Sequence, residues 1–271
     1  MKRFLAAVTL TAGLLSAAHA VPQALAIDVI PGDPGERTDM VVFHSDGHWT
    51  GTPNVRETRP ALSLAKLYLG YFVLANGTPE DKGKVLRMVR MSDDLLAVEL
   101  DSAYPGAINK VAEEFELDDT YSKGYWGKSG TSPYDLAKFV TMIMNDPVAE
   151  PLIRGMANHA PYAQDGFKQD FGTDQLEGVI GSKFGWADDR ESAFGSVSFG
   201  SDWVAAAMTY GDVDEHTDDV HEWIGQAENS PLSFGFKEPT TGRLTARNGA
   251  GELFLWMTDQ GHWGLRTLDV L

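Results

Sequence analysis

The chain has 271 residues, of which 43% are hydrophobic and 23% charged, and its formal net charge is −17. This composition is typical of a globular protein with one large domain or two small ones. The strong negative charge disfavours nucleic acid and anionic lipid as partners, and we expect neither. Because the chain contains no cysteine, it has neither a disulfide framework nor a lipid-anchored cysteine.

Residues 1–20 have the pattern of a secretory signal peptide. Lys2 and Arg3 precede a short apolar stretch, and Ala18-His19-Ala20 matches a cleavage site. No stop-transfer pattern follows, so we expect no stable membrane span after cleavage. Export without disulfides is typical of a bacterial envelope protein, and the mature chain is predicted to be secreted or to reside in the cell envelope of a bacterium.

The elements expected after the signal peptide change in type along the chain. Residues 21–37 contain three prolines and are predicted to form an extended lead-in. Residues 118–130 are expected to form a loop, and residues 149–178 carry mixed signals. The remaining predicted elements are a hairpin at 39–52, helices at 60–74, 79–91, 105–115 and 134–144, strands at 178–186, 192–199 and 203–210, a helix at 214–227, and strand-like segments at 253–257 and 263–268.

Strands at both ends with helices between them predict an α+β fold. The expected core is one antiparallel sheet formed by N- and C-terminal strands, with a helical cluster inserted between them. We expect this domain to cover residues 38–227. Residues 228–271 are predicted to pack on it as a C-terminal extension, because their apolar segments are unlike a disordered linker.

The segment 60–74 is predicted to be a buried helix, because it is apolar on every side except at Ser63 and Lys66. Positions three apart share a helix face, so the hydroxyl and the amine can meet near the first turn. The helix dipole there favours developing negative charge, and a desolvated lysine loses its proton more readily. This pattern is typical of an activated serine nucleophile. The alternative is a helix start that Ser63 caps, with Lys66 extending to solvent.

Two further motifs follow in order along the chain. Ser92-Asp93-Asp94 lies at a predicted helix junction, and Lys183-Phe184-Gly185 lies on a predicted strand. In isolation, Ser92 is more typical of a helix cap and Lys183 of a charge on an edge strand. Together with Ser63-Leu64-Ala65-Lys66, however, the order resembles the S-x-x-K, S-D-N and K-T-G motifs of the penicillin-recognising serine hydrolases, which include class A β-lactamases and penicillin-binding proteins.

The resemblance covers about residues 39–227 and includes Thr131-Ser132-Pro133-Tyr134-Asp135-Leu136-Ala137, which is similar to a T-T-P-x-D helix start of that family. It implies the β-lactamase/transpeptidase fold with a shortened helical cluster, since the gap between the first two motifs is short for a class A enzyme. It also implies roles: Ser63 as the acylated nucleophile and Lys66 as its proton acceptor.

The other implied site residues come from the second and third motifs. Ser92 would pass a proton toward the leaving nitrogen, and Lys183 would hold both Ser92 and a substrate carboxylate. The implied oxyanion hole consists of the backbone N–H groups of Ser63 and Trp186. The implied substrate-binding positions are Asp94, Phe184 and Gly185.

Three departures from the family pattern bear on activity. Asp94 stands where the family has asparagine, so it cannot donate a hydrogen bond and it favours a charged Lys66. Phe184 replaces a threonine whose hydroxyl helps to hold a substrate carboxylate. No E-x-x-L-N element occurs in residues 117–130, so a deacylating glutamate has no counterpart. The nearby acids, Glu113, Glu114 and Glu116, are more typical of a solvated helix face.

We therefore expect an exported serine hydrolase-like protein that acts on peptidoglycan peptides or β-lactams through an acyl-serine intermediate. Without the glutamate, a peptidase-like reaction with slow deacylation is favoured. A divergent class A-like β-lactamase is one alternative, and a non-catalytic module that binds peptidoglycan peptides through a degenerate site is another. No cofactor is expected, and the sequence does not indicate an oligomeric state.

The histidines do not predict a metal site. Neither His44 with His48, nor His216 with His221, matches a standard zinc-ligand spacing. We therefore expect no metal.

Overall fold

The structure is a computed structural model that describes residues 27–30 and 34–226 and the backbone of strands at 233–236, 243–248, 251–257 and 263–268. The predicted signal peptide at 1–20 lies outside the described residues. Among the described helices, none is both long enough and apolar enough to cross a membrane.

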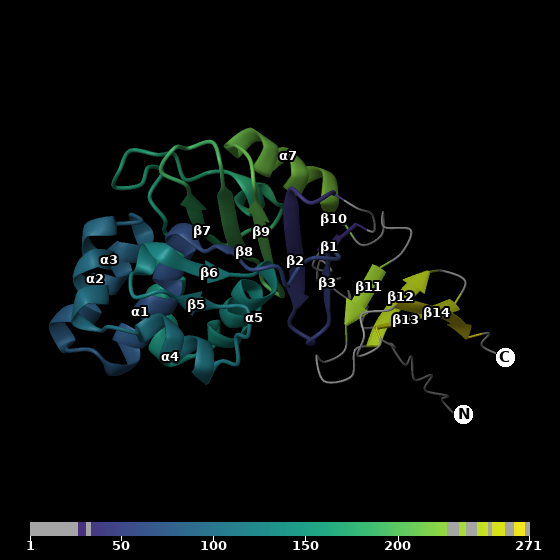
Figure 1. Ribbon diagram of the computed structural model, residues 1–271, viewed down its shortest axis with the longest axis horizontal. Coiled ribbons are helices and arrows are strands. Elements are labelled where there is room, and N and C mark those ends of the chain that lie inside the picture. The colour runs from purple at the N-terminus through teal and green to yellow at the C-terminus, as the bar shows by residue number, and fades with distance from the viewer. Residues whose placement is uncertain are drawn as a thin grey trace, which may run out of the picture.

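A five-stranded antiparallel sheet lies at the centre of the fold (Figure 1). Its order is β3-β2-β9-β8-β7, so a hairpin from the N-terminal part of the chain pairs with three strands from much later in the chain. The predicted closure of one sheet by both ends of the domain is confirmed. The strands are β2 Thr38–His44, β3 Trp49–Gly51, β7 Gly181–Trp186, β8 Phe194–Phe199 and β9 Trp203–Thr209.

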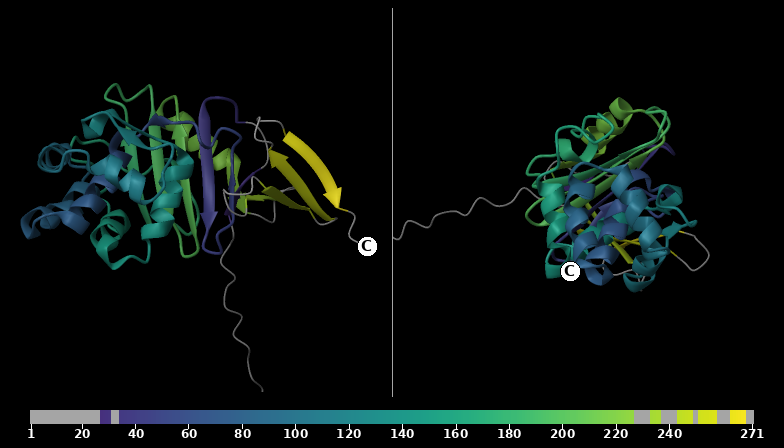
Figure 2. Two further views of the ribbon diagram at one scale, coloured as in Figure 1. Left: turned by 60° about the horizontal axis from the view of Figure 1, so that its bottom comes forward. Right: turned by 90° about the vertical axis from the view of Figure 1, so that its left-hand side faces the viewer.

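Helices cover both faces of this sheet (Figure 2). Side chains alternate along β2: Val41 and Phe43 join the core under the inserted helical cluster, whereas Met40 and Val42 join a second core with Val220 of α7. The helices are α1 Ala65–Asn76, α2 Pro79–Arg90, α3 Asp94–Ala103, α4 Ala107–Glu114, α5 Pro133–Ile143, α6 Glu150–Ala157 and α7 Val213–Trp223, and the 3₁₀ helices are η1 Leu62–Leu64, η2 Trp126–Lys128, η3 Pro147–Ala149 and η4 Gly172–Gln175.

Local sequence accounts for several helix starts. The side chain of Thr78 caps α2, and that of Ser132 caps α5, each accepting a hydrogen bond from the backbone N–H three residues on. A proline follows each cap at the first helical position, where no N–H is needed. Asp212 and Glu215 form a capping box at the start of α7.

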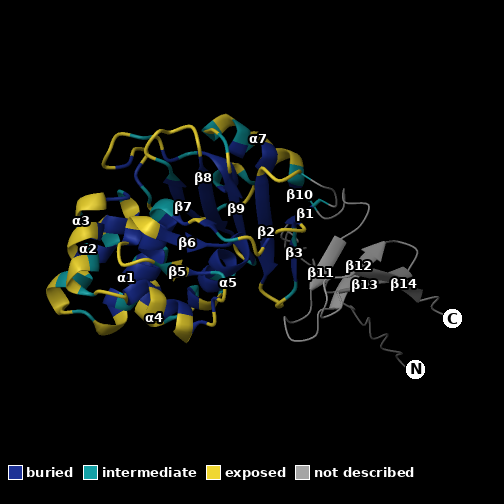
Figure 3. Cartoon of the chain, in the orientation of Figure 1, coloured by how far each residue is buried: buried dark blue, intermediate teal, exposed yellow. Residues whose placement is uncertain are grey.

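Helix α1 is buried on almost every side, as predicted (Figure 3). Residues 65–71 are all buried, and α1 contacts α2, α3, α4 and α6. The expected helix start is different: the chain forms the short strand β4, Arg59–Pro60, and then the 3₁₀ turn η1 before α1 begins. Ser63 therefore lies in η1, and Lys66 in the first turn of α1.

One predicted boundary was wrong. Helix α7 ends at Trp223 rather than continuing to residue 227, because the β-branched Ile224 is extended and starts strand β10, Ile224–Gln226. Strand β10 pairs with β1, Ile27–Val29, which lies in the expected lead-in. Both β1 and Ile224 contribute buried side chains to the core on the α7 side of the sheet.

Two regions carry structure that the sequence patterns did not indicate. The expected loop at 118–130 contains β5, Tyr121–Ser122, and η2, and β6, Ser129–Thr131, starts at its end. These strands form a small sheet in the order β4-β6-β5. Residues 149–178 contain α6 and η4.

The C-terminal part of the chain contains a separate antiparallel sheet in the order β11-β12-β13-β14. The expected strand-like segments at 253–257 and 263–268 correspond to its last two strands. Packing of residues 228–271 on the preceding domain stays a prediction. The strands are β11 Ser233–Phe236, β12 Arg243–Asn248, β13 Gly251–Met257 and β14 Trp263–Leu268.

Candidate active site

Two residues of the candidate site other than glycine, Leu62 and Ser92, have left-handed backbone conformations. Leu62, directly before Ser63, has φ of 52°, and Ser92 has φ of 49°. A leucine with positive φ is strained, because its Cβ crowds the backbone. Such strain persists where the surrounding structure holds it, and it is concentrated at functional sites. Ser92 does not cap α3, because the side chain of Asp93 does so by accepting a hydrogen bond from the Leu96 N–H.

Ser63, Lys66 and Asp94 are joined by direct hydrogen bonds. Lys66 Nζ donates to Ser63 Oγ over 2.5 Å and to Asp94 Oδ1 over 2.6 Å. Lys66 has no exposed surface, whereas the Asp94 side chain is 56% exposed. The predicted meeting of the serine hydroxyl and the lysine amine is therefore present, and Asp94 connects this pair to the solvent-exposed start of α3.

Opposing effects act on the charge of Lys66. Burial lowers its pKa, and the carboxylate of Asp94 raises it in turn. The ring of Trp126 also favours the ammonium form, because Lys66 Nζ lies 4.1 Å from the centroid of that ring. The net direction is a pKa below the ordinary value for lysine, which favours use of Lys66 as a base.

Ser92 and Lys183 form a second bonded pair. Lys183 Nζ donates to Ser92 Oγ over 2.8 Å and to the backbone carbonyl of Phe184 over 2.9 Å. Lys183 is 1% exposed. Its pKa lies well below the ordinary value, first because the amine is buried and second because Lys66 places another positive charge nearby. The structure thus brings all four predicted polar groups into one region between α1, α3 and β7.

Gly185 leaves space beside the backbone nitrogen of Ser63. A Cβ atom at position 185 would lie 3.0 Å from that nitrogen and 2.7 Å from Leu62 Cβ. The nitrogen lies at a helix start, where N–H groups have no partner within the helix. Only glycine therefore leaves the N–H of Ser63 open to a bound oxygen atom.

Trp186 can supply a second N–H to the same space. Trp186 lies opposite Phe194 on β8. The next pair along the strands, Ala187 and Ala193, is hydrogen-bonded, because the Ala187 N–H donates to Ala193 O over 2.9 Å. Antiparallel pairs alternate, so the Trp186 N–H points away from β8 and toward the free edge of β7. The geometry therefore fits the predicted oxyanion hole.

Solved structures with the same fold come from two groups of proteins. A β-lactamase from Sphaerobacter thermophilus matches with a TM-score of 0.53 and 15% identity, over 68% of this chain and 87% of that one. A D-alanyl-D-alanine carboxypeptidase from Mycobacterium tuberculosis matches with a TM-score of 0.53 and 18% identity, over 72% and 92%. The chain has the fold of the penicillin-recognising serine hydrolases. No protein-family model and no curated protein sequence matches it.

A third match within this fold is penicillin-binding protein D2 from Listeria monocytogenes in its cefotaxime-bound form. It aligns with a TM-score of 0.52 and 15% identity, over 71% of this chain and 97% of that one. The predicted fold class is therefore confirmed, and the low identities leave the activity to be argued from the site itself.

The side chain of Phe184 does not face a substrate, although position 184 was expected to bind one. Its side chain has no exposed surface, and its ring packs against Phe171, with centroids 5.0 Å apart, and against His159 at 5.1 Å. The family resemblance gave position 184 as a substrate-binding position, with phenylalanine in place of a threonine. The Phe184 ring belongs instead to an aromatic core, because phenylalanine gains more from burial than from contact with water. The side chain of position 184 thus offers nothing to a substrate carboxylate.

Asp165, in the loop between α6 and η4, is a site residue that no sequence motif indicates. Its carboxylate accepts a hydrogen bond from Trp186 Nε1 over 3.0 Å, and its charge raises the pKa of both Lys66 and Lys183. The loop is held beside Ser92, since the backbone N–H of Gln164 donates to Met91 O over 2.7 Å. The segment 149–178 carries no clear periodicity, so only its fold brings Asp165 to the site.

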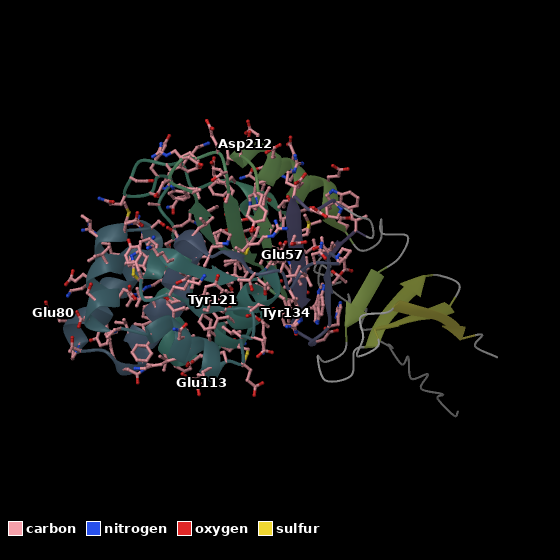
Figure 4. The ribbon with its side chains drawn as sticks, viewed as in Figure 1. Glu57, Glu80, Glu113, Tyr121, Tyr134 and Asp212 are labelled. Carbon is pink, nitrogen blue, oxygen red and sulfur yellow. The ribbon has the colours of Figure 1, made fainter. Side chains whose placement is uncertain are left out.

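The acids at the end of α4 and just after it lie on the solvent side of the helical cluster. Glu113, Glu114 and Glu116 are exposed, and Glu113 points outward in Figure 4. The described carboxylates whose charges act on both lysines are Asp94 and Asp165. The prediction that these glutamates form a solvated face is consistent with their exposure.

Proposed function

We propose that this chain is an exported serine hydrolase-like protein that forms an acyl-serine intermediate with cell-wall peptides or β-lactams and deacylates slowly. The observation that carries the proposal is the 2.5 Å hydrogen bond between the buried Lys66 amine and Ser63 Oγ. The choice of substrate class rests on the neighbours of the same fold, which include a carboxypeptidase and a cefotaxime-bound penicillin-binding protein. Export rests on the signal-peptide pattern of residues 1–20 alone.

In the proposed reaction, neutral Lys66 accepts the Ser63 proton as Oγ attacks the carbonyl carbon. The negative charge that develops on the carbonyl oxygen is held by the N–H groups of Ser63 and Trp186. Ser92 relays the proton from Lys66 to the leaving nitrogen, giving up its own hydroxyl proton and taking one from Lys66, and Lys183 positions the Ser92 hydroxyl. The acyl-enzyme then forms as the bond to nitrogen breaks.

Slow deacylation follows from the carboxylates near the site. A water molecule that attacks the acyl-serine needs a base within hydrogen-bond reach. Asp94 is engaged with Lys66 over 2.6 Å, and Asp165 accepts from Trp186 over 3.0 Å, so neither carboxylate is a free base. We expect the intermediate to persist for this reason.

A non-catalytic binding module is the second candidate. It is favoured by Asp94 and Trp126, which both stabilise the ammonium form of Lys66 and so oppose proton transfer from Ser63. Under this alternative, peptide ligands bind in the site without forming a covalent bond.

Labelling with a fluorescent penicillin separates these candidates. The proposal expects covalent labelling of the full chain that is lost in Ser63→Ala and strongly slowed in Lys66→Met, which keeps the apolar stem. Label that persists for hours supports slow deacylation, and rapid decay with turnover supports a β-lactamase. A folded protein that does not label supports the binding module.

A further inference from the structure

Asp28, His44 and His48 come together at the end of the β2–β3 hairpin. Each offers a ligand atom, and these three atoms all lie within 4.8 Å of one another. Asp28 comes from β1, His44 ends β2, and His48 immediately precedes β3. This cluster does not include any residue of the candidate active site.

The hairpin brings the two histidines together. Phe43 pairs with Trp49, so His44 and His48 are the next opposite positions, and the His44 N–H donates to His48 O over 2.9 Å. Gly47 allows the tight turn, with φ of 89°. The two histidines are close in sequence, but the sequence does not indicate a third ligand. Asp28 lies near them only because β1 packs beside the hairpin in the fold.

Asp28 and His44 form a buried and oriented pair. Asp28 is 4% exposed and His44 is 6% exposed. His44 Nε2 lies 2.9 Å from Asp28 Oδ1, and Thr50 Oγ1 donates to the same oxygen over 3.1 Å. The backbone N–H of Val29 in turn donates to Thr50 Oγ1 over 2.9 Å. The Asp28 carboxylate is therefore held in place by His44 of β2 and Thr50 of β3.

His48 has the arrangement of a metal-binding histidine. Its Nδ1 bonds to the carboxylate of Asp46, which leaves Nε2 as the available ligand atom. Metal-ligating histidines commonly bond to a carboxylate through the second ring nitrogen. The His48 ring stacks on that of His44, with centroids 3.9 Å apart, and the His48 side chain is 41% exposed. An exposed ring has room to tilt out of this stack so that both rings point a nitrogen at one ion.

We propose that Asp28, His44 and His48 bind one divalent transition-metal ion of the zinc type. Two imidazoles and one carboxylate match the donors of zinc sites built from two histidines and an acidic residue, with a fourth position left for water. Calcium and magnesium prefer oxygen ligands alone, so this donor set disfavours them. The inference does not depend on the proposed function.

Metal binding at this position ties β1 to the central sheet. Among the described residues, β1 pairs as a strand only with β10, and side-chain hydrogen bonds of Asp28 and Thr50 connect it to β2 and β3. A bound ion would add a link from β1 to His48 in the hairpin turn. An ion that binds the folded state and not the unfolded state raises the melting temperature as its concentration increases.

Titration with zinc chloride tests the proposal. We expect the untagged full chain to bind one zinc ion in calorimetry and to show a zinc-dependent rise in melting temperature. His48→Ala removes an exposed side chain and should keep the fold while weakening zinc binding at least tenfold. Asp46→Asn should weaken it about tenfold or more, through the second ring nitrogen of His48.

His221→Ala is the matched control, because His221 is an exposed histidine of α7 that is not one of the three ligands. It should bind zinc as the wild-type chain does. Cobalt(II) provides a second readout, since a site with nitrogen ligands produces visible absorption bands that His48→Ala should lose. Absence of zinc binding in the wild-type chain overturns the proposal, and so does unchanged zinc binding in folded His48→Ala.

Discussion

The amine of Lys66 lies 2.6 Å from Asp94 Oδ1, and the Lys66 side chain has no exposed surface. A buried ammonium without a partner is costly, and this ion pair reduces the cost. The same carboxylate raises the pKa of Lys66 and so opposes its use as a base. Asp94 therefore connects the stability of the site to its reactivity.

Asp94→Asn should speed acylation of Ser63. Loss of the carboxylate lowers the pKa of Lys66 further, and each unit of decrease gives about tenfold more neutral amine at a pH below that pKa. The pH profile of acylation should therefore move to lower pH. Stopped-flow or gel-based labelling with a fluorescent penicillin measures the rate.

Glu99→Gln is the control for the change in net charge, because Glu99 lies on the same helix and pairs with Lys84 instead. It should leave the acylation rate unchanged. A slower or equal rate in a well-folded Asp94→Asn variant means that Asp94 has a role beyond its charge.

Gly185→Ala should block the oxyanion hole. The added Cβ would lie 3.0 Å from the Ser63 nitrogen and 2.7 Å from Leu62 Cβ. Loss of one oxyanion donor commonly costs about 100- to 1,000-fold in rate. We also expect a loss of about 1–3 kcal/mol in the free energy of unfolding, from crowding in a packed region.

Gly83→Ala is the matched control for this substitution. Gly83 lies within α2, and nothing stands within 4 Å of a Cβ added there. It should keep the labelling rate and raise the free energy of unfolding by up to about 1 kcal/mol. Equal labelling rates in Gly185→Ala and Gly83→Ala contradict the proposed oxyanion hole.

His216 should make the protein sensitive to acid. It is fully buried in α7, where its two ring nitrogens lie 2.8 Å from Ser196 Oγ and 2.7 Å from Thr209 Oγ1. Burial lowers its pKa to about 3, below its usual 6.5. Between these values only the unfolded state binds the proton, so His216 reduces stability as the pH falls, by about 1.4 kcal/mol per unit.

Urea unfolding from pH 6.5 to pH 4 measures this dependence. His216→Gln keeps a donor and an acceptor and should show a flatter loss of stability than the wild-type chain. His221→Gln, on the exposed side of the same helix, should retain the wild-type slope. Parallel slopes for His216→Gln and the wild-type chain contradict a neutral buried His216.

The sequence predicted the candidate site where local pattern and chemistry coincide. Ser63 and Lys66 are predictable because two polar side chains are unusual in an otherwise apolar helix. Ser92 and Lys183 are predictable because their motifs follow the first motif in the family's order. Their hydrogen bonds follow from that placement. The motifs alone did not reveal the strained backbone at Leu62, since its conformation depends on packing around η1.

The remaining features depend on contacts between distant segments. Asp165 reaches the lysines through a loop that carries no periodic pattern, and Phe184 is buried by aromatic residues from other elements. Strand β1 pairs with β10 across almost the whole domain. A local pattern does not specify such pairings, because packing across the fold decides them.

Intact-mass spectrometry after mixing with penicillin tests the central claim, that Ser63 forms an acyl-enzyme that persists. We predict an increase of one penicillin mass on the full chain, stable over hours, located at Ser63 by peptide digestion and absent in Ser63→Ala. An unchanged mass at saturating penicillin in a folded wild-type chain, or the same adduct in Ser63→Ala, contradicts the account.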